Sequence, residues 1–224
     1  MQDFDKYSET YQKELDRCLN FSGETSGYFA EYKARYLQRL LHGDYDGNIL
    51  DYGCGVGMLS ASMAKYLPRA KLSGYDVSAA SIGKTSDKIA AKGLFTHDIS
   101  KLGVDYDLIV LSNVLHHLPP GERGMTIESL YGRLSRAGLM VIFEHNPLNP
   151  LTRRVVDRCP FDKDARLLAP SEAAGYLLRA GFHISRLDYI VFFPGQLKWF
   201  RPLERFLGRL PLGAQYVITA KRDA

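Results

Sequence analysis

Three glycines that alternate with other residues constrain the fold of this chain more than any other sequence feature. Gly53, Gly55 and Gly57 follow a short apolar run that contains Asp51, and a helical pattern begins just after them. A strand that turns at once into a helix needs residues that tolerate unusual backbone angles, and a ligand against that turn needs residues without bulky side chains. These residues therefore predict a strand, a tight ligand-binding turn and a helix.

Polar residues also end the apolar runs that follow along the chain. Asp76, Asp98 and Asn113 each stand at the end of an expected strand. The expected strands are residues 48–53, 71–76, 94–97, 106–112 and 138–145, and the expected helices are residues 57–66, 79–91 and 122–135. Strands that alternate with helices predict an α/β fold with a parallel sheet, in which the carboxyl ends of the strands share one edge. We therefore expect these polar residues to meet in one site.

Taken in order, these motifs resemble those of the class I S-adenosylmethionine (SAM) methyltransferases, and the resemblance covers roughly residues 28–144. It implies a Rossmann-like, mostly parallel seven-stranded sheet with helices on both faces. Residues 182–193 and 214–221 would supply an antiparallel C-terminal hairpin at the edge of that sheet. The resemblance also implies SAM as the cofactor and methyl transfer as the reaction.

The same resemblance assigns roles to the residues at the strand ends. Asp51 would anchor the amino-acid end of SAM, and Asp76 would accept hydrogen bonds from its ribose hydroxyls. Asp98 would accept a hydrogen bond from the adenine amine, while Val77 packs on the adenine ring. The full set expected to bind the cofactor is Asp51, Gly53, Cys54, Gly55, Gly57, Asp76, Val77, Asp98, Ile99 and Asn113.

Two other functions are compatible with parts of this pattern. A dehydrogenase would share the fold, but it would carry the spacing G-x-G-x-x-G, whereas this chain has G-x-G-x-G. A non-catalytic SAM-binding partner protein is the second alternative. For an enzyme we expect a small-molecule acceptor methylated at oxygen, with carbon and nitrogen left open. Residues 112–115 read Ser-Asn-Val-Leu and lack an Asn/Asp-Pro-Pro-Tyr-like motif, which disfavours methylation of nucleobase amines.

An oxygen acceptor must lose a proton, and four residues near the ends of the fourth and fifth expected strands could take it. These candidate catalytic residues are His116, His117, Glu144 and His145. Histidine suits the task because its pKa lies near neutral pH. The same residues could bind a metal ion, but neighbouring histidine side chains diverge in extended or helical backbone. We therefore predict no metal site.

Apolar residues spaced three and four apart predict amphipathic helices over residues 4–20 and 28–41, joined by flexible residues 22–27. Residues 1–42 would then form an N-terminal helical lid, with Tyr7 or Tyr11 closing over the cofactor. The alternative is that these tyrosines pack in the core or on the surface.

The basic excess of the chain lies beyond the cofactor motifs, because residues 149–224 contain 13 Lys and Arg against 7 Asp and Glu. We expect residues 146–213 to form substrate-side cap insertions, with Arg153 and Arg154 binding an anionic group of the substrate. Residues 197–210 predict a basic amphipathic helix. It would be either a cap whose apolar face covers the active site or a contact with an anionic membrane. A lipid-linked or phosphorylated substrate would suit both basic regions.

Length and composition set broader bounds. A chain of 224 residues fits a single domain, and a net charge of +4 does not indicate a nucleic-acid partner. Three cysteines without metal-like spacing favour a reducing cytoplasm over a disulfide framework. The start is acidic and lacks the apolar core of a signal peptide, and no apolar run approaches the roughly 18 residues that span a bilayer. The oligomeric state is left open.

Overall fold

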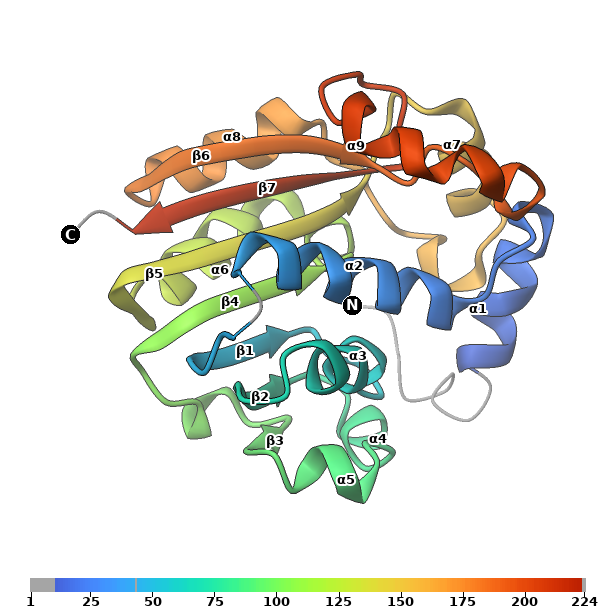
Figure 1. The fold of residues 1–224 in the computed structure, drawn as a ribbon. Coiled ribbons are helices and arrows are strands. Elements are labelled where there is room, and N and C mark those ends of the chain that lie inside the picture. Colours follow the sequence, from blue (N-terminus) through green and yellow to red (C-terminus); the bar gives the residue numbers. More distant parts are fainter. Residues whose placement is uncertain (1–10, 43, 223–224) are drawn as a thin grey trace.

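A seven-stranded sheet organises the described part of the chain, residues 11–42 and 44–222 of the computed structural model (Figure 1). The strands are β1 (Asn48–Tyr52), β2 (Lys71–Tyr75), β3 (Phe95–Thr96), β4 (Tyr106–Ser112), β5 (Leu134–His145), β6 (Phe182–Ile190) and β7 (Gln215–Arg222). Their order is β3-β2-β1-β4-β5-β7-β6. The pairs among the first five strands are parallel, and β7 runs antiparallel to both β5 and β6. The predicted fold, including its C-terminal hairpin, is confirmed.

Helices cover both faces of this sheet because alternate side chains of the central strands point in opposite directions. Leu50 and Ile109 pack with α6 and α8, whereas the neighbouring Ile49 and Leu108 pack with α2 and α3. The α-helices are α1 (Tyr11–Leu19), α2 (Ser26–Leu40), α3 (Met58–Tyr66), α4 (Ala79–Ile82), α5 (Asp87–Ala90), α6 (Pro120–Tyr131), α7 (Pro150–Val156), α8 (Pro170–Arg179) and α9 (Glu204–Leu207). The 3-10 helices are η2 (Asn20–Ser22), η3 (Ile99–Lys101), η4 (Leu115–His117), η5 (Pro160–Asp162) and η6 (Gly195–Leu203).

The sheet order reverses between β1 and β4, and ligands of such folds bind beyond the carboxyl ends of the strands at this point. In Figure 1 the arrowheads of β1 and β5 point toward the side of the molecule where α1, α7 and α9 lie. These segments come from both ends of the chain. They therefore flank the edge of the sheet at which the predicted polar residues end their strands.

Most expected elements are present, and the differences have local causes. The helix expected over residues 79–91 is two short helices, α4 and α5, because Gly83 and the polar residues after it interrupt it. The helix expected over residues 122–135 ends earlier, at Tyr131, and β5 begins at Leu134. The strand expected over residues 182–193 stops before Val191, whose φ of 61° is incompatible with a strand.

The N-terminal helices are tied to the rest of the molecule. Helix α2 buries Ala34 and Leu37 in the core, so part of the tyrosine-rich pattern is core packing. The expected flexible joint is held in place, since Glu24 forms an ion pair with Arg201 and the Arg201 guanidinium lies 4.3 Å from the centroid of the Tyr28 ring. Tyr7 and the side chain of Tyr11 lie outside the described residues. The lid function of residues 1–42 stays a prediction.

The prediction of one amphipathic helix over residues 197–210 is wrong. The segment is the 3-10 helix η6 with a kink at Leu197, followed by the four-residue α9. Pro202 inside the segment lacks a backbone N–H, which prevents a continuous α-helix. Its apolar side chains are not turned inward, because Trp199 and Phe206 are 70% and 69% exposed. The expectation of a cap with an inward apolar face is therefore also wrong.

No helix within the described ranges combines the length and the apolar character needed to cross a membrane.

Glu204 fixes the C-terminal segment by three hydrogen bonds from a buried position. Its carboxylate accepts the backbone N–H groups of Phe192 and Phe193 at 3.0 and 3.1 Å and the Tyr32 hydroxyl at 2.7 Å. A buried donor that loses its acceptor pays a desolvation penalty. One carboxylate thus holds α2, the end of β6 and α9 together.

We predict that Glu204→Ala lowers the free energy of unfolding by about 2–4 kcal/mol, because three donors lose their acceptor. Tyr32→Phe removes one of these hydrogen bonds and should cost about 1 kcal/mol. Denaturant unfolding measures both changes. Glu128→Ala, at an exposed position of α6, is the matched control and should leave stability within about 0.5 kcal/mol of the parent. Equal losses for the Glu204 and Glu128 variants would contradict the role of Glu204.

Candidate active site

The glycine turn after β1 has the backbone that its sequence predicts. Gly53, Gly55 and Gly57 have positive φ angles of 78°, 53° and 83°, a region that glycine adopts without strain. A Cβ atom on Gly53 would overlap with the Val114 side chain. Around the corresponding position on Gly55, by contrast, no atom of the described residues lies within 4 Å beyond its own chain neighbours. The turn is therefore closed by packing at its start and open at Gly55.

Asp76 anchors this turn from the end of β2. One carboxylate oxygen accepts the Gly55 N–H at 2.8 Å, and the other accepts the Ser78 N–H at 2.9 Å. The amides of Gly53 and Cys54 both donate to the Tyr75 carbonyl, at 2.7 and 2.9 Å. The amides at 53, 54 and 55 thus have acceptors inside the protein. A carboxylate oxygen can accept more than one hydrogen bond, so these contacts do not by themselves exclude a ligand.

Asp51 lies in β1 just before the turn and is almost fully buried. The Ser60 hydroxyl of α3 donates to its carboxylate at 2.6 Å. Burial raises the pKa of Asp51 to about 6, and the nearby Asp76 carboxylate raises it further against the opposing effects of Ser60 and Lys33. The site therefore holds an acid that a cationic group would help to ionise.

Two apolar side chains are exposed at the same edge of the sheet. Val77 follows β2 and Ile99 follows β3, and they are 54% and 40% exposed. Asp98 caps the 3-10 helix η3, because its carboxylate accepts both the N–H and the hydroxyl of Ser100, at 3.0 and 2.6 Å. These hydrogen bonds to Ser100 lower the pKa of Asp98. The structure thus places all three predicted residues at the ends of neighbouring strands, with Asp98 also in its capping role.

Asn113 directly follows β4 and has a left-handed φ of 59°. Its backbone N–H donates to the Phe143 carbonyl at 2.8 Å, while its side-chain Oδ1 is buried without a hydrogen-bond donor in the described part of the chain. Buried acceptors of this kind are rare in folded proteins and indicate a missing partner such as a ligand or water.

Sequence reasoning missed Lys33, a buried lysine on α2. Its ammonium donates to the Ser112 hydroxyl at 2.7 Å, next to Asn113. Burial lowers the pKa of Lys33 to about 8, although the Glu144 and Asp51 carboxylates oppose that shift. The available signal was its position among the apolar residues of a helix that was otherwise assigned to packing. A charged group on the buried face of a helix needs partners, and these lie at the carboxyl edge of the sheet.

Glu144 and His116 form a buried pair at the ends of β5 and β4. His116 Nδ1 lies 2.6 Å from one Glu144 oxygen, and the other oxygen accepts the N–H groups of Val114 and Leu115 at 3.1 and 2.7 Å. Although burial favours neutral imidazole, the Glu144 and Asp162 carboxylates raise the pKa of His116 to about 9. Burial also opposes the charge on Glu144, but His116 holds its pKa below the usual value.

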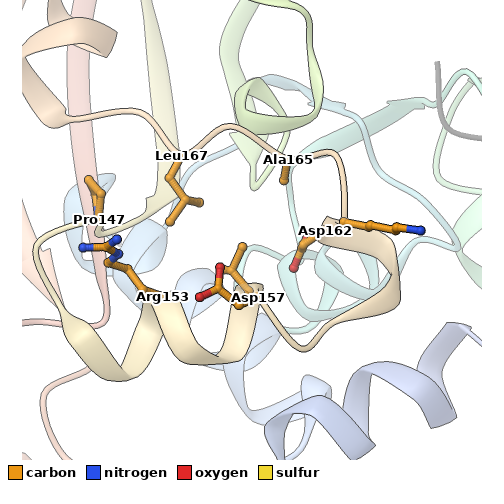
Figure 2. Close-up of a pocket in the computed structure, with 8 residues that line it drawn as sticks. Pro147, Arg153, Asp157, Asp162, Ala165 and Leu167 are labelled. Atoms are coloured by element: carbon orange, nitrogen blue, oxygen red, sulfur yellow. The ribbon is translucent and has the colours of Figure 1, made fainter.

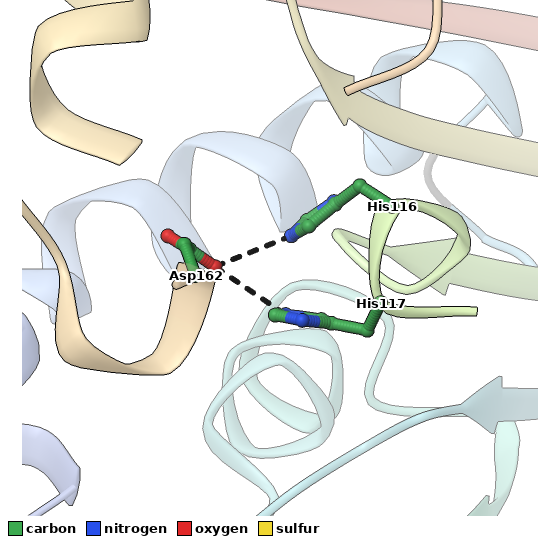
Figure 3. Close-up of side chains that lie close together, drawn as sticks. All are labelled: His116, His117 and Asp162. Carbon is green, nitrogen blue, oxygen red and sulfur yellow. Dashed lines mark ion pairs between the residues drawn. The ribbon is translucent and has the colours of Figure 1, made fainter. Parts of the chain in front are cut away.

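His117 and His145 complete a cluster of imidazoles with this pair. The ring centroids of both lie close to that of His116, at 4.1 and 5.1 Å. Burial, aided by the charge on His116, lowers the pKa of His117 to about 3 and that of His145 to about 4. Sequence reasoning also missed Asp162, whose Oδ1 lies 3.5 Å from the Nε2 atoms of both His116 and His117 (Figure 3). The expectation that the adjacent histidines diverge is therefore wrong, because the tight 3-10 turn of η4 points both rings the same way.

A pocket of about 470 Å³ opens beside this cluster (Figure 2). Arg153 extends into it from α7 and Asp157 from the residue after that helix, while Asp162 and Lys163 come from η5 and the residue after it. Of the two predicted substrate-binding residues, Arg153 lines this pocket and the exposed Arg154 does not, and the role of both stays a prediction. The lining carries two basic and two acidic side chains, so the pocket is polar without being strongly positive.

Comparison with known proteins decides the family. A family model described as a methyltransferase domain matches residues 26–185, more than half of the chain. The chain belongs to this methyltransferase family. The predicted class I SAM-dependent methyltransferase, with SAM as its cofactor, is therefore confirmed.

Solved structures share the fold of this methyltransferase along nearly its whole length. Magnesium protoporphyrin IX methyltransferase from Synechocystis PCC 6803, with bound SAH, has a TM-score of 0.66 at 19% identity and covers 98% of this chain and 97% of its own. A TehB-like SAM-dependent methyltransferase from Corynebacterium glutamicum has a TM-score of 0.65 at 18% identity, covering 98% and 99%. At these identities the similarity concerns the fold.

Curated relatives of the methyltransferase match over shorter stretches. An uncharacterized protein from Synechococcus is 31% identical over 104 residues, which are 42% of this chain and 24% of that protein. Ribosomal RNA small subunit methyltransferase C from Pseudomonas putida is 35% identical over 89 residues, which are 40% and 26%. The chain thus spans about a quarter of the length of these relatives.

The raised pKa of Asp51 leads to a prediction about pH. The folded pKa of about 6 exceeds the usual aspartate pKa of 3.8, so the stability that this group contributes is fully present below pH 4 and is lost as pH rises through 6. We expect the parent to lose up to roughly 3 kcal/mol of stability relative to Asp51→Asn across this window. Denaturant unfolding of both proteins at several pH values measures the difference. A difference that stays constant from pH 4 to pH 7 would exclude the shift.

Proposed function

We propose that this enzyme transfers the methyl group of SAM to a small-molecule acceptor, with oxygen as the accepting atom. The observation that supports this most directly is that Asp76 and Asn113 lie at the same edge of the sheet, beside the open side of Gly55. The two Asp76 oxygens accept the backbone N–H groups of Gly55 and Ser78, and a carboxylate oxygen can accept more than one hydrogen bond, while Asn113 Oδ1 is buried without a donor in the described residues. These features fit an adenosyl compound that lies over the turn.

Each part of SAM has residues that suit it. Asp76 would accept hydrogen bonds from the two ribose hydroxyls, and the open side chains of Val77 and Ile99 would cover the adenine ring while Asp98 accepts from its amine. At the other end, Asp51 would attract the amino group. Lys33 would attract the carboxylate of the methionine tail from its buried position beside Ser112. The predicted cofactor set would therefore include Lys33 as well.

SAM supplies a methyl group on a cationic sulfur, which leaves in an in-line displacement. The protein must align the acceptor, exclude water and take up a proton. Glu144 and His116 are almost fully buried and bond to each other, so we assign them to positioning: Glu144 holds the amides of the loop after Asn113. His117 and His145 are partly exposed and remain the candidates for the proton acceptor.

We place the acceptor in the pocket lined by Arg153, Lys163, Asp157 and Asp162. The guanidinium of Arg153 favours an anionic group on the acceptor, and the two carboxylates favour hydroxyl donors. A polar metabolite with both kinds of group fits this lining better than a nucleic acid, for which the net charge of +4 gives little support. We also propose a cytoplasmic location, since Cys18, Cys54 and Cys159 are free thiols.

Isothermal titration with SAM and SAH tests the cofactor site. Asp76→Ala should weaken both ligands at least tenfold, because the loss of two charge-assisted hydrogen bonds costs about 1.5–3 kcal/mol each. Lys33→Met should weaken them through the methionine end. Asp105→Ala, at an exposed loop position, is the control and should bind as the parent does. If the Asp76 variant retains the parent's affinity, or the parent binds NAD but not SAM, the proposed function fails.

A lipid-linked acceptor at a membrane surface is the second candidate, and one surface patch favours it. Trp199, Phe206 and Leu212 are 70%, 69% and 65% exposed, and the exposed Lys198 and Arg205 stand among them. Apolar side chains with interspersed basic groups suit an anionic bilayer. Arg201 does not contribute, because it pairs with Glu24.

Sedimentation with phosphatidylglycerol-containing vesicles tests this candidate. The parent should sediment with the vesicles, and Lys198→Glu combined with Arg205→Glu should weaken binding by at least about tenfold, since each basic residue near the surface contributes about 1 kcal/mol. Arg136→Glu, at an exposed position early in β5, should have little effect. A parent that stays in the supernatant removes the membrane as a partner.

A further inference from the structure

Three side chains beside the pocket form a set that the cofactor site does not use. His116 and His117 belong to η4 and Asp162 belongs to η5, so the set joins the loop after β4 to the insertion after β5. Figure 3 shows both imidazole rings directed at the same carboxylate. Their candidate ligand atoms all lie within 4.8 Å of one another. We propose that His116, His117 and Asp162 bind a divalent transition-metal ion, with Zn²⁺ as the best match.

The distances in this set are those of metal ligands. The Nε2 atoms of His116 and His117 each lie 3.5 Å from Asp162 Oδ1, which is too long for a good hydrogen bond. Two ligands at the usual Zn–N and Zn–O distances of about 2.1 Å are about 3.4 Å apart at a tetrahedral ion. An ion between the three side chains would therefore fit the two histidine–Asp162 distances without moving Asp162. The remaining distance, between the two Nε2 atoms, can adjust because the His117 side chain is 20% exposed.

His116 is already oriented as a ligand. Its Nδ1 is engaged by Glu144 at 2.6 Å, so the other nitrogen faces the set. This Nε2 is buried and makes no hydrogen bond with any described residue. A carboxylate that orients a histidine through its second nitrogen is the usual outer partner of a metal-bound imidazole. The Nε2 atom, whose contact with Asp162 at 3.5 Å is too long for a good hydrogen bond, and its carboxylate support on Nδ1 are thus two observations that point to a ligand at this position.

The chemistry of the set selects the kind of ion. Two imidazole nitrogens and one carboxylate oxygen suit Zn²⁺ and its first-row neighbours, whereas Mg²⁺ and Ca²⁺ prefer oxygen ligands. Three protein ligands leave at least one position open, as in catalytic zinc sites. Asp162 also lines the 470 Å³ pocket, so the open position would face the space assigned to the acceptor.

A metal ion would assist the deprotonation of the acceptor, and this part of the inference rests on the proposed function. An acceptor hydroxyl bound to the ion would lose its proton more readily, because the ion stabilises the oxygen anion. His117 would then be occupied as a ligand. His145, outside the set but with its ring 5.1 Å from that of His116, would be left to receive the proton.

Metal binding is tested without SAM or acceptor. The full chain, free of affinity tags and stripped with a chelator, is titrated with Co²⁺ and followed by its visible absorption, and then with Zn²⁺ by calorimetry. We expect one ion per chain and intense bands typical of a low-coordinate Co²⁺ site. Asp162→Asn and His117→Ala should each weaken Zn²⁺ binding at least tenfold, since each removes one of three ligands.

Two controls make the outcome decisive. His183→Ala removes an exposed histidine of β6, and Asp157→Asn changes another acid of the same pocket; neither should change the affinity for Zn²⁺. Binding that is absent in the parent, or that falls as much in these controls, overturns the metal site. SAM titration of the stripped protein separates the two proposals: SAM should bind unchanged, so failure of the metal site leaves the cofactor site standing, and the reverse also holds.

Discussion

The carboxylate of Glu144 is the interaction on which the arrangement of the site depends. From the end of β5 it accepts two backbone amides of the loop after β4 and engages His116, all within a region closed to solvent. If a buried carboxylate loses one of its partners, the protein is strongly destabilised, because the buried charge is left uncompensated. These contacts hold the loop in place, with Asn113 toward the proposed cofactor site and the imidazoles toward the pocket. The proposed cofactor and acceptor regions are thus positioned by the same group.

The fold and the strand-end residues could be predicted because they follow from short-range patterns. Alternating apolar strands and helices specify a parallel sheet, and a parallel sheet brings strand ends to one edge whatever the loops between them do. Asp51, Asp76 and Asn113 were therefore placed correctly from spacing alone. The role of Gly53 was similarly predictable, since a strand that turns at once into a helix needs a residue that tolerates a positive φ; the overlap of a Cβ there with Val114 is known only from the structure.

Residues that enter the site from distant segments could not be predicted. Lys33 reaches Ser112 across 79 positions of sequence, and its place among the apolar residues of α2 does not say which partner it meets. Asp162 meets His116 and His117 only because η5 folds back over η4. The segment around Pro202 misled the periodicity argument, because apolar residues three and four apart occur equally in a broken helix. Its exposed aromatic residues can be recognised only once their neighbours are known.

The contacts between the two ends of the chain have a consequence for how the protein is made. Glu24 pairs with a residue 177 positions further on, and Tyr32 with one 172 positions further on. Contacts of such large sequence separation are slow to form. During synthesis, α2 emerges early, but its Tyr32 cannot form the hydrogen bond to Glu204 until residue 204 has left the ribosome. The order of translation thus delays completion of the packing around α2 until residues 201–204 are available.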